Sequence, residues 1–207
     1  MSDQRSRDRS QTEAAIIDAA KTLIAREGFA SLGVNALARE AGCDKQLIYR
    51  YFSGLDGVID AVGEDLADWV KTRLRPLLAL GKPANYAELM ERLALGLLQA
   101  FRDDPLMQRL KAWEFAAPTA QLTRIAAARG ASLQQWMNEA RGSLTPPPNI
   151  DAAAVNALLI ASIEAIAVTA AASPRVYGMT LSSEQDWERV RAALKGVVTA
   201  IYGKGPA

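Results

Sequence analysis

Residues 33–52, with the sequence GVNALAREAGCDKQLIYRYF, constrain the fold of this chain more than any other stretch. Their first part places apolar side chains at positions i, i+3, i+4 and i+7, the spacing of one buried helix face: Val34, Leu37, Ala38 and Ala41. Gly42 follows, and glycine closes a helix at low cost because it adopts positive φ. Asp44 can accept hydrogen bonds from the free amides that open another helix. The pattern predicts two short helices joined by a tight turn.

The second of these helices presents polar side chains on one side and Ile48 on the other. A helix, a glycine-containing turn and a second helix form a helix-turn-helix unit, whose second helix lies in the major groove of double-stranded DNA. Gln pairs with adenine and Lys with guanine, so Lys45 and Gln46 are the candidates for base contacts. Either side chain could instead contact phosphate or water.

The remaining candidates for DNA contacts surround these two residues. Arg50 suits a phosphate or a guanine, or it packs over its own helical bundle. Leu47 suits a thymine methyl group or the core, and Tyr51 is expected to face the groove or the DNA backbone. Asn35 and the amide of Gly33 stand at the positive end of the first helix, where a phosphate can bind.

These motifs resemble those of the TetR family of bacterial transcriptional regulators. The resemblance rests on a long first helix ending in Glu27-Gly28-Phe29, on LAREAG at 37–42 and on IYRYF at 48–52. It implies an all-α fold, in which an N-terminal three-helix helix-turn-helix bundle is joined by a long connecting helix to a C-terminal helical ligand-binding and dimerisation domain. It also implies that Tyr49 contacts the DNA backbone, which fixes register without reading sequence.

Three positions depart from the family pattern. Gly33 replaces a Ser or Thr cap, Leu47 replaces a small or hydroxyl residue, and Leu55 replaces a Lys that grips phosphate. Fewer phosphate partners lower the affinity for DNA and flatten its salt dependence. An alternative prediction is therefore an all-helical interaction or ligand-binding module that has lost specific DNA binding.

The helical pattern also predicts three regions of the chain. Residues 1–10 are expected to form a flexible basic arm, with Arg5, Arg7 and Arg9, that is either solvated or reaches DNA. Residues 11–53 are expected to form the DNA-binding domain, with a first helix from Gln11 because Ser10 and Glu13 have capping-box spacing. Residues 54–207 are expected to bind an effector and to dimerise.

Apolar periodicity in the third region predicts a series of helices. The connecting helix runs from 55 to about 80, and further helices are expected at about 85–102, 104–116, 119–141, 152–172 and 183–202. The apolar helix at 152–172 is long enough for a membrane, but Glu164 near its middle favours packing against other helices. The family resemblance implies a homodimer through about 151–173 and 183–202, and no membrane partner.

Few residues in the sequence indicate where a small-molecule effector binds. Apolar and aromatic side chains that could line a pocket are Trp69, Phe101, Trp113 and Met137. Glu114 and Glu164 stand in apolar surroundings, where a carboxylate needs a partner. That partner is expected to be Arg102, Arg109 or Arg124, or else a cationic ligand.

Histidine is absent from the sequence. This removes the commonest general base and metal ligand, and no nucleophile–base pair or phosphate-binding glycine loop replaces it. We therefore expect no catalytic residue, no metal, no cofactor and no enzyme activity. The single Cys43 excludes an internal disulfide, and residues 1–11 do not resemble a signal peptide, so a cytoplasmic location is expected. The sequence predicts a regulator, acting as a repressor on a palindromic operator and released by an effector.

Overall fold

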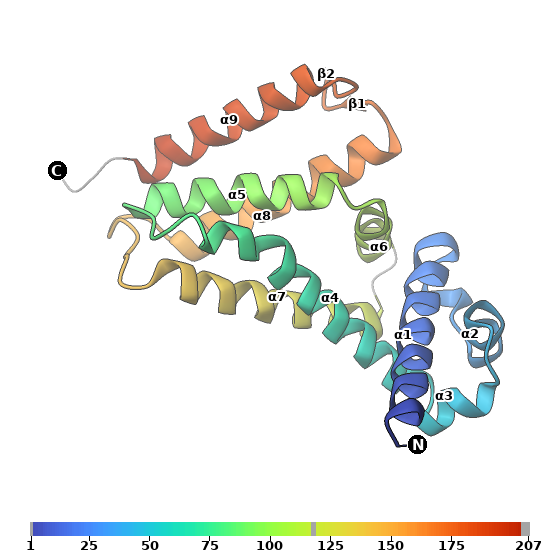
Figure 1. The fold of residues 1–207 in the computed structure, drawn as a ribbon. Helices are drawn as coiled ribbons and strands as arrows, with labels where there is room; N and C mark the ends of the chain where they lie inside the picture. The colour runs from blue at the N-terminus through green and yellow to red at the C-terminus, as the bar shows by residue number, and fades with distance from the viewer. Residues whose placement is uncertain (1, 117–118, 204–207) are drawn as a thin grey trace. The chain divides into compact units, whose positions relative to one another are not determined.

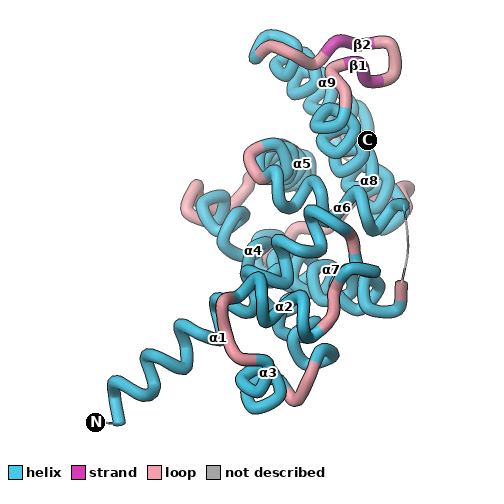
Figure 2. Tube along the Cα trace, turned by 90° about the vertical axis from the view of Figure 1, so that its right-hand side faces the viewer, coloured by secondary structure: helices cyan, strands magenta, loops and turns pink. Residues whose placement is uncertain are grey.

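The computed structural model describes residues 2–116 and 119–203, and helices make up nearly all of the trace (Figures 1 and 2). The elements in chain order are α1 (Ser2–Glu27), the 3₁₀ turn η1 (Phe29–Ser31), α2 (Val34–Ala41), α3 (Lys45–Phe52), α4 (Leu55–Leu78), α5 (Tyr86–Arg102), α6 (Pro105–Ala116), α7 (Ala120–Arg141), α8 (Ala152–Ala172), β1 (Arg175–Val176), β2 (Met179–Thr180) and α9 (Glu184–Tyr202). The predicted all-α class is confirmed. A short antiparallel hairpin of β1 and β2, which was not expected, precedes α9.

The chain forms two compact units, and each unit combines two stretches of sequence. The first contains Met1–Trp69 and Arg109–Ala131, and the second contains Val70–Gln108 and Ser132–Ala207. A segment from the middle of the chain therefore packs with the N-terminal helices. The functional division expected after residue 53 stays a prediction.

Helix α1 begins at Ser2, earlier than the Gln11 expected from sequence. The expected start at Gln11 is therefore wrong, and Ser10 lies inside the helix instead of capping it. The flexibility of residues 1–10 stays a prediction. Helical contacts continue across this region, because Arg9 forms an ion pair with Glu13 at 2.7 Å and the Thr12 hydroxyl donates to the Asp8 carbonyl at 2.8 Å. The side chains of residues 1–7 lie outside the described residues.

The core of the first unit gathers one apolar face from each short helix. Helix α1 contributes four side chains with at most 2% exposure, as its periodicity predicts: Ile16, Ala20, Leu23 and Ile24. Leu37 of α2 and Ile48 of α3 are fully buried. Complete burial of each leucine or isoleucine side chain contributes roughly 1.5–3 kcal/mol, so these residues set the orientation of all three helices.

Two ion-pair groups link α1 to its neighbours in the first unit. The Arg26 guanidinium donates to both carboxylate oxygens of Glu40 on α2, at 3.1 and 2.9 Å. The Lys21 ammonium donates to Asp65 on α4 at 2.7 Å, and the Lys21 side chain is only 13% exposed. These contacts attach α2 and the first part of α4 to the same helix.

In the second unit, α5 packs against both α8 and α9 (Figure 1). A partly buried polar chain joins the three helices: the Asn156 amide donates to the Tyr86 hydroxyl at 3.1 Å, and the Tyr202 hydroxyl donates to the Asn156 oxygen at 2.7 Å. The two tyrosine rings also meet edge to face, with centroids 5.1 Å apart. Burial, with the nearby Tyr86 and Asp151, raises the pKa of Tyr202 to about 12. Tyr202 therefore stays a donor at neutral pH.

Helix α8 is mostly apolar but packs on one side only. Its length and mean hydropathy of 1.9 would suffice to cross a membrane, yet only 17% of its most apolar window is buried in the chain. The buried residues are Leu159, Ile163 and Ala167. The expected packing against other helices is thus found on a single face, and Leu158 on another face is 71% exposed.

The substitution Asn156→Ala tests the polar chain of the second unit. It should lower the free energy of unfolding by roughly 1–3 kcal/mol, because the hydroxyls of Tyr86 and Tyr202 both lose their partner in a buried place. Urea unfolding followed by circular dichroism measures the change. The control is Asn138→Ala, on the exposed surface of α7; equal effects of the two substitutions would contradict the interpretation.

Candidate nucleic-acid interface

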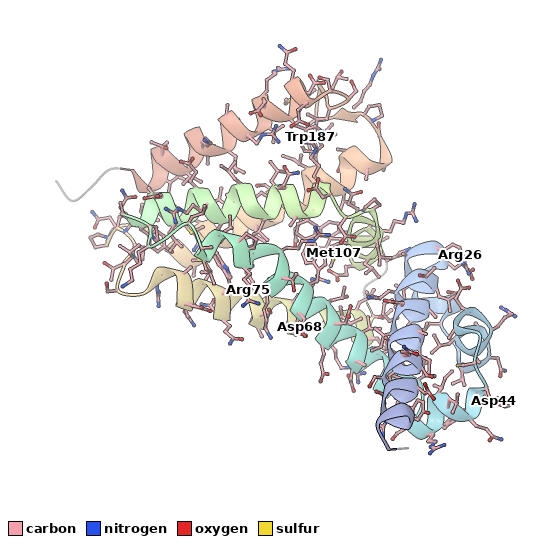
Figure 3. The ribbon with its side chains drawn as sticks, in the orientation of Figure 1. Arg26, Asp44, Asp68, Arg75, Met107 and Trp187 are labelled. Atoms are coloured by element: carbon pink, nitrogen blue, oxygen red, sulfur yellow. The ribbon has the colours of Figure 1, made fainter. Side chains whose placement is uncertain are left out.

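The turn between α2 and α3 has the local structure that the sequence predicts. Gly42 ends α2 with a φ of 63°, and its N–H donates to the Arg39 carbonyl at 3.3 Å. Asp44 stands at the start of α3 (Figure 3), where its carboxylate accepts the Gln46 N–H at 2.8 Å. This cap offsets roughly 1 kcal/mol that the free amide would cost. Residues 34–52 therefore form a helix-turn-helix unit.

The fully buried Ile48 determines which side of α3 faces solvent. Four of the predicted DNA-contact residues lie on the exposed side: Lys45, Gln46, Tyr49 and Arg50. Tyr49 is 56% exposed, which is a large exposure for an aromatic side chain. Leu47 is half-buried, so it contributes to the core as well as to the surface. The exposed side of α3 carries donors and cations suited to phosphates and base edges.

Tyr51 is half-buried beneath two guanidinium groups. Arg50 lies over its ring at 5.8 Å from the centroid, and Arg9 of α1 lies over the ring at 5.1 Å. Arg50 therefore packs over its own bundle, one of the two alternatives left open by the sequence, while remaining exposed. The contact from Arg9 was not predicted, because no periodic pattern joins residues so far apart in the chain.

The two other predicted contact residues stand at the beginning of α2. Gly33 is the N-cap of α2, and no side chain accepts a hydrogen bond from the free amides at the start of this helix. The hydroxyl cap of the family pattern is therefore missing in the folded chain. Asn35, in the first turn, is exposed. Contacts of Gly33 and Asn35 with DNA stay predictions.

The six candidate effector-binding residues divide between the two units. Trp69, Trp113 and Glu114 belong to the first unit, and the second unit contains the others: Phe101, Met137 and Glu164. Trp113 lines a cavity of about 310 Å³ in the first unit. The other five line neither this cavity nor one of about 250 Å³ in the second unit, within the residues that the structure describes. Their role in effector binding stays a prediction.

Glu114 forms a nearly buried ion-pair cluster within the first unit. Its carboxylate accepts from Arg129 on α7 at 2.5 and 2.7 Å and pairs with Lys111, one turn earlier on α6, at 2.9 Å. For Glu114 the expected Arg102 and Arg124 were the wrong partners, because Arg102 pairs with Glu184 and Arg124 with Asp60. The partner expected for Glu164 stays a prediction. Spacing along the sequence could suggest Lys111, but only the packing of α7 brings in Arg129.

Opposing effects act on the pKa of Glu114. Burial, the largest effect, raises this pKa, but hydrogen bonds and positive charges from Arg129 and Lys111 outweigh burial and hold the pKa below 4.5. The carboxylate is thus charged and satisfied by side chains at neutral pH. This favours the structural partner over a cationic ligand for Glu114.

Neither a metal site nor a reactive thiol accompanies the interface. In the ranges 2–116 and 119–203, no group of three or more His, Cys, Asp or Glu side chains is placed to hold a metal ion. Partial burial and the neighbouring Asp44 raise the pKa of the Cys43 thiol, so it stays protonated at neutral pH.

Comparison with known proteins finds a family model that matches the helix-turn-helix unit. Residues 16–62 match the family described as bacterial regulatory proteins, tetR family. An uncharacterized HTH-type transcriptional regulator of Mycobacterium tuberculosis is 33% identical over 101 residues, which cover 47% of this chain and 46% of the relative. The match thus spans about half the length of that relative.

Solved structures resemble the fold over nearly its whole length. A TetR family transcription regulator from Marinobacter aquaeolei superposes with a TM-score of 0.67 at 16% identity, covering 96% of this chain and 98% of the other. The regulator FadR from Bacillus subtilis, in complex with stearoyl-CoA, superposes with a TM-score of 0.63 at 17% identity, covering 93% and 99%. At these identities the likeness is one of fold.

Glu114→Gln tests the buried ion-pair cluster. At pH 7 it should lower the free energy of unfolding by roughly 3–5 kcal/mol, because Arg129 is left buried without its anion. Since the folded-state pKa lies below 4.5, the wild-type pair stabilises the fold above that pH and loses its contribution as the pH falls through the folded-state value. The difference between wild type and variant should therefore shrink in acid.

Urea unfolding between pH 3 and pH 7, at roughly half-unit steps, measures this dependence. The control is Glu64→Gln, which neutralises an exposed carboxylate of α4 in the same unit. If both substitutions have the same small effect at pH 7, Glu114 does not hold this part of the fold.

Proposed function

We propose that this chain is a DNA-binding transcriptional regulator, because its residues 16–62 match the family of bacterial regulatory proteins described as tetR. It acts as a homodimer on a palindromic operator, most simply as a repressor that a small-molecule effector releases. It works in the cytoplasm, where it reaches the chromosome, and it catalyses no reaction.

The observation that carries the proposal is the exposed side of α3. Lys45, Gln46 and Tyr49 are exposed on a helix whose Ile48 is fully buried and whose first turn is capped by Asp44. A rigid, capped helix with donors on one side suits insertion into a major groove. Lys45 and Gln46 contact bases, while Tyr49 and Arg50 fix register on phosphates.

The exposed faces of α8 and α9 support the homodimer. Each helix carries mostly small exposed residues at positions i, i+1, i+4, i+5 and i+8: Ala153, Ala154, Ala157, Leu158 and Ala161 on α8, and Ala192, Ala193, Gly196, Val197 and Ala200 on α9. Small side chains allow two helices to approach closely, and exposed apolar faces mark sites of association. Two copies of this pair of helices form a four-helix interface, which covers Leu158 and Val197.

Helix α4 supplies a route between effector and DNA. It is continuous from Leu55 to Leu78, with residues 55–69 in the first unit and 70–78 in the second. An effector lowers the affinity for DNA only to the extent that it binds more tightly to the conformation that does not bind DNA than to the one that does. The complex of the similar FadR from Bacillus subtilis with stearoyl-CoA supports a ligand-responsive regulator as the general class. Effector binding in this chain shifts α4 and changes the spacing of the two α3 helices.

Selection from a random DNA pool tests DNA reading. The wild-type chain should enrich a palindrome, and Lys45→Ala or Tyr49→Ala should weaken binding to it by roughly 10-fold or more, because each contact contributes about 1–3 kcal/mol. The Tyr49 variant should also reduce the slope of log affinity against log salt by about 1. Both variants should keep the wild-type circular dichroism, since the substituted side chains are exposed.

Arg141→Ala, an exposed change at the end of α7, is the control and should bind as wild type does. No enrichment by the wild type at low salt would reject the proposal in favour of an interaction or ligand-binding module without specific DNA binding. That alternative draws on Gly33, Leu47 and Leu55, which lack the phosphate-binding groups of the family pattern.

Leu158→Glu and Val197→Glu test the proposed dimer interface. Each should convert the dimer to a monomer at micromolar concentration, because a carboxylate buried there without a partner costs at least about 3 kcal/mol. Sedimentation velocity measures the molecular mass. Leu80→Glu is the matched control, because Leu80 is 62% exposed but lies outside α8 and α9. A dimer that persists in both test variants would place the interface elsewhere.

A further inference from the structure

A cavity of about 310 Å³ lies inside the first unit, beside the corner that joins α1 to α2. The corner itself, from Glu27 to Ala30, forms one wall. Leu55 and Ile59 of α4 form another, and Trp113 of α6 and Leu122 of α7 complete the apolar lining. The volume lies at the lower end of the range for pockets that bind small molecules, roughly 300–1,000 Å³.

Trp113 provides a flat aromatic wall held at a fixed place. A Cβ atom at Gly28 would lie 2.9 Å from one carbon of the Trp113 ring, closer than real contacts allow, and 3.0 Å from two others. Gly28 also has a φ of 82°, a conformation that L side chains rarely adopt. The indole therefore packs directly on the backbone of the corner, which fixes its position in the cavity.

The polar side chain in the lining that offers both a donor and an acceptor is Gln121, whose carboxamide has no hydrogen-bond partner among the described residues. The Thr119 hydroxyl accepts the Leu122 N–H at 3.2 Å and keeps its O–H as a second, weaker donor. An amide both donates and accepts, so it can pair with a single N–H, hydroxyl or carbonyl group. A ligand with more polar groups would leave them without partners in an apolar lining.

The charge at the lining disfavours anions. Glu27 lines the cavity, and its carboxylate pairs with Arg26, which also pairs with Glu40. The Arg26 hydrogen bond and the charge of Arg39 both lower the pKa of Glu40, so Glu40 already has two cations nearby. Among the described residues no cation lines the cavity. A ligand that carries a carboxylate would therefore lose its hydration beside an apolar wall and the Glu27 carboxylate, without gaining a positive partner.

We propose that this cavity binds a neutral, planar aromatic molecule that lies against Trp113 and makes one hydrogen bond with Gln121. Because Gly28 belongs to the same wall, an occupant stabilises one position of the α1–α2 corner. Given the DNA-binding function proposed above, the occupant thereby changes the affinity of α3 for the operator. Binding in the cavity does not itself depend on that function.

Indole is the first probe, added to the full-length, ¹⁵N-labelled chain. The four Trp residues of the sequence give separate indole N–H signals in NMR spectra, and loss of one signal in Trp113→Phe assigns that of Trp113. Titration should shift the Trp113 signal saturably, with a Kd of roughly 1 mM or below. The signals of Trp136 and Trp187, which belong to the second unit, should stay in place.

The polar contact is tested with a pair of variants. Gln121→Leu should weaken indole binding by roughly 3- to 10-fold, because it removes one hydrogen bond while keeping the size of the side chain. Gln135→Leu makes the same change at an exposed position of the same helix and should leave the Kd unchanged. Equal weakening by both variants, or none by Gln121→Leu, would overturn the assigned site.

The ligand class is tested with indole-3-acetate, which adds a carboxylate to the same ring. It should bind at least roughly 5-fold more weakly than indole, and Glu27→Gln should reduce that difference. Equal affinity of the anion for the wild-type chain would overturn the assignment to neutral molecules. A Trp113 signal that does not move at all would overturn the site.

DNA binding is measured separately on the selected operator. Saturable indole binding in a chain that binds no DNA would leave the cavity site standing and reject the regulatory function. Operator binding in a chain that does not bind indole would reject the cavity site alone. If indole binds without changing operator affinity, the proposed effect of the occupant on α3 is wrong.

Discussion

Burial of Ile48 is the constraint on which the nucleic-acid interface depends. This side chain is fully excluded from solvent, as is Leu37 of α2. With 3.6 residues per turn, an inward Ile48 turns Lys45, Gln46 and Tyr49 away from the core. A polar residue at position 48 would lose the apolar contacts and free α3 to rotate. The exposed donors therefore owe their orientation to one apolar contact, and the Asp44 cap holds the first turn of the same helix in place.

A partly buried polar chain has a similar role in the second unit. Tyr86, Asn156 and Tyr202 come from three different helices and hydrogen-bond to one another. Such a chain is costly when incomplete, so it favours one register of α8 and α9 on α5. That register determines which side of the two helices stays uncovered. Both uncovered sides are rich in alanine, with Leu158 and Val197 exposed among these small residues.

The sequence predicted the elements that follow local rules. Apolar periodicity, Gly42 and Asp44 were enough to place α2 and α3 to within a residue, and the long helices of the second unit followed from the same periodicity. Contacts between distant residues could not be predicted. No local signal pairs Glu114 with Arg129 or Arg9 with Tyr51, because packing alone brings them together. The start of α1 was misplaced, because the spacing of Ser10 and Glu13 suits a capping box but is equally compatible with the interior of a helix.

The corner at Gly28 depends both on local sequence and on a contact between distant residues. Its positive φ is a local property, which a glycine after a helix predicts. The lack of space for a Cβ atom comes instead from Trp113, on a helix far along the chain. Glu114, the next residue of that helix, is fixed to α7 by Arg129. The backbone of α6 is therefore fixed to α7 next to Trp113, and the indole meets Gly28 just after the end of α1. Any shift of α6 that moves the indole changes the space open to the corner, and α2 begins only a few residues later. Within the first unit, the contact between Trp113 and Gly28 is therefore enough to couple α6 to the helix-turn-helix unit.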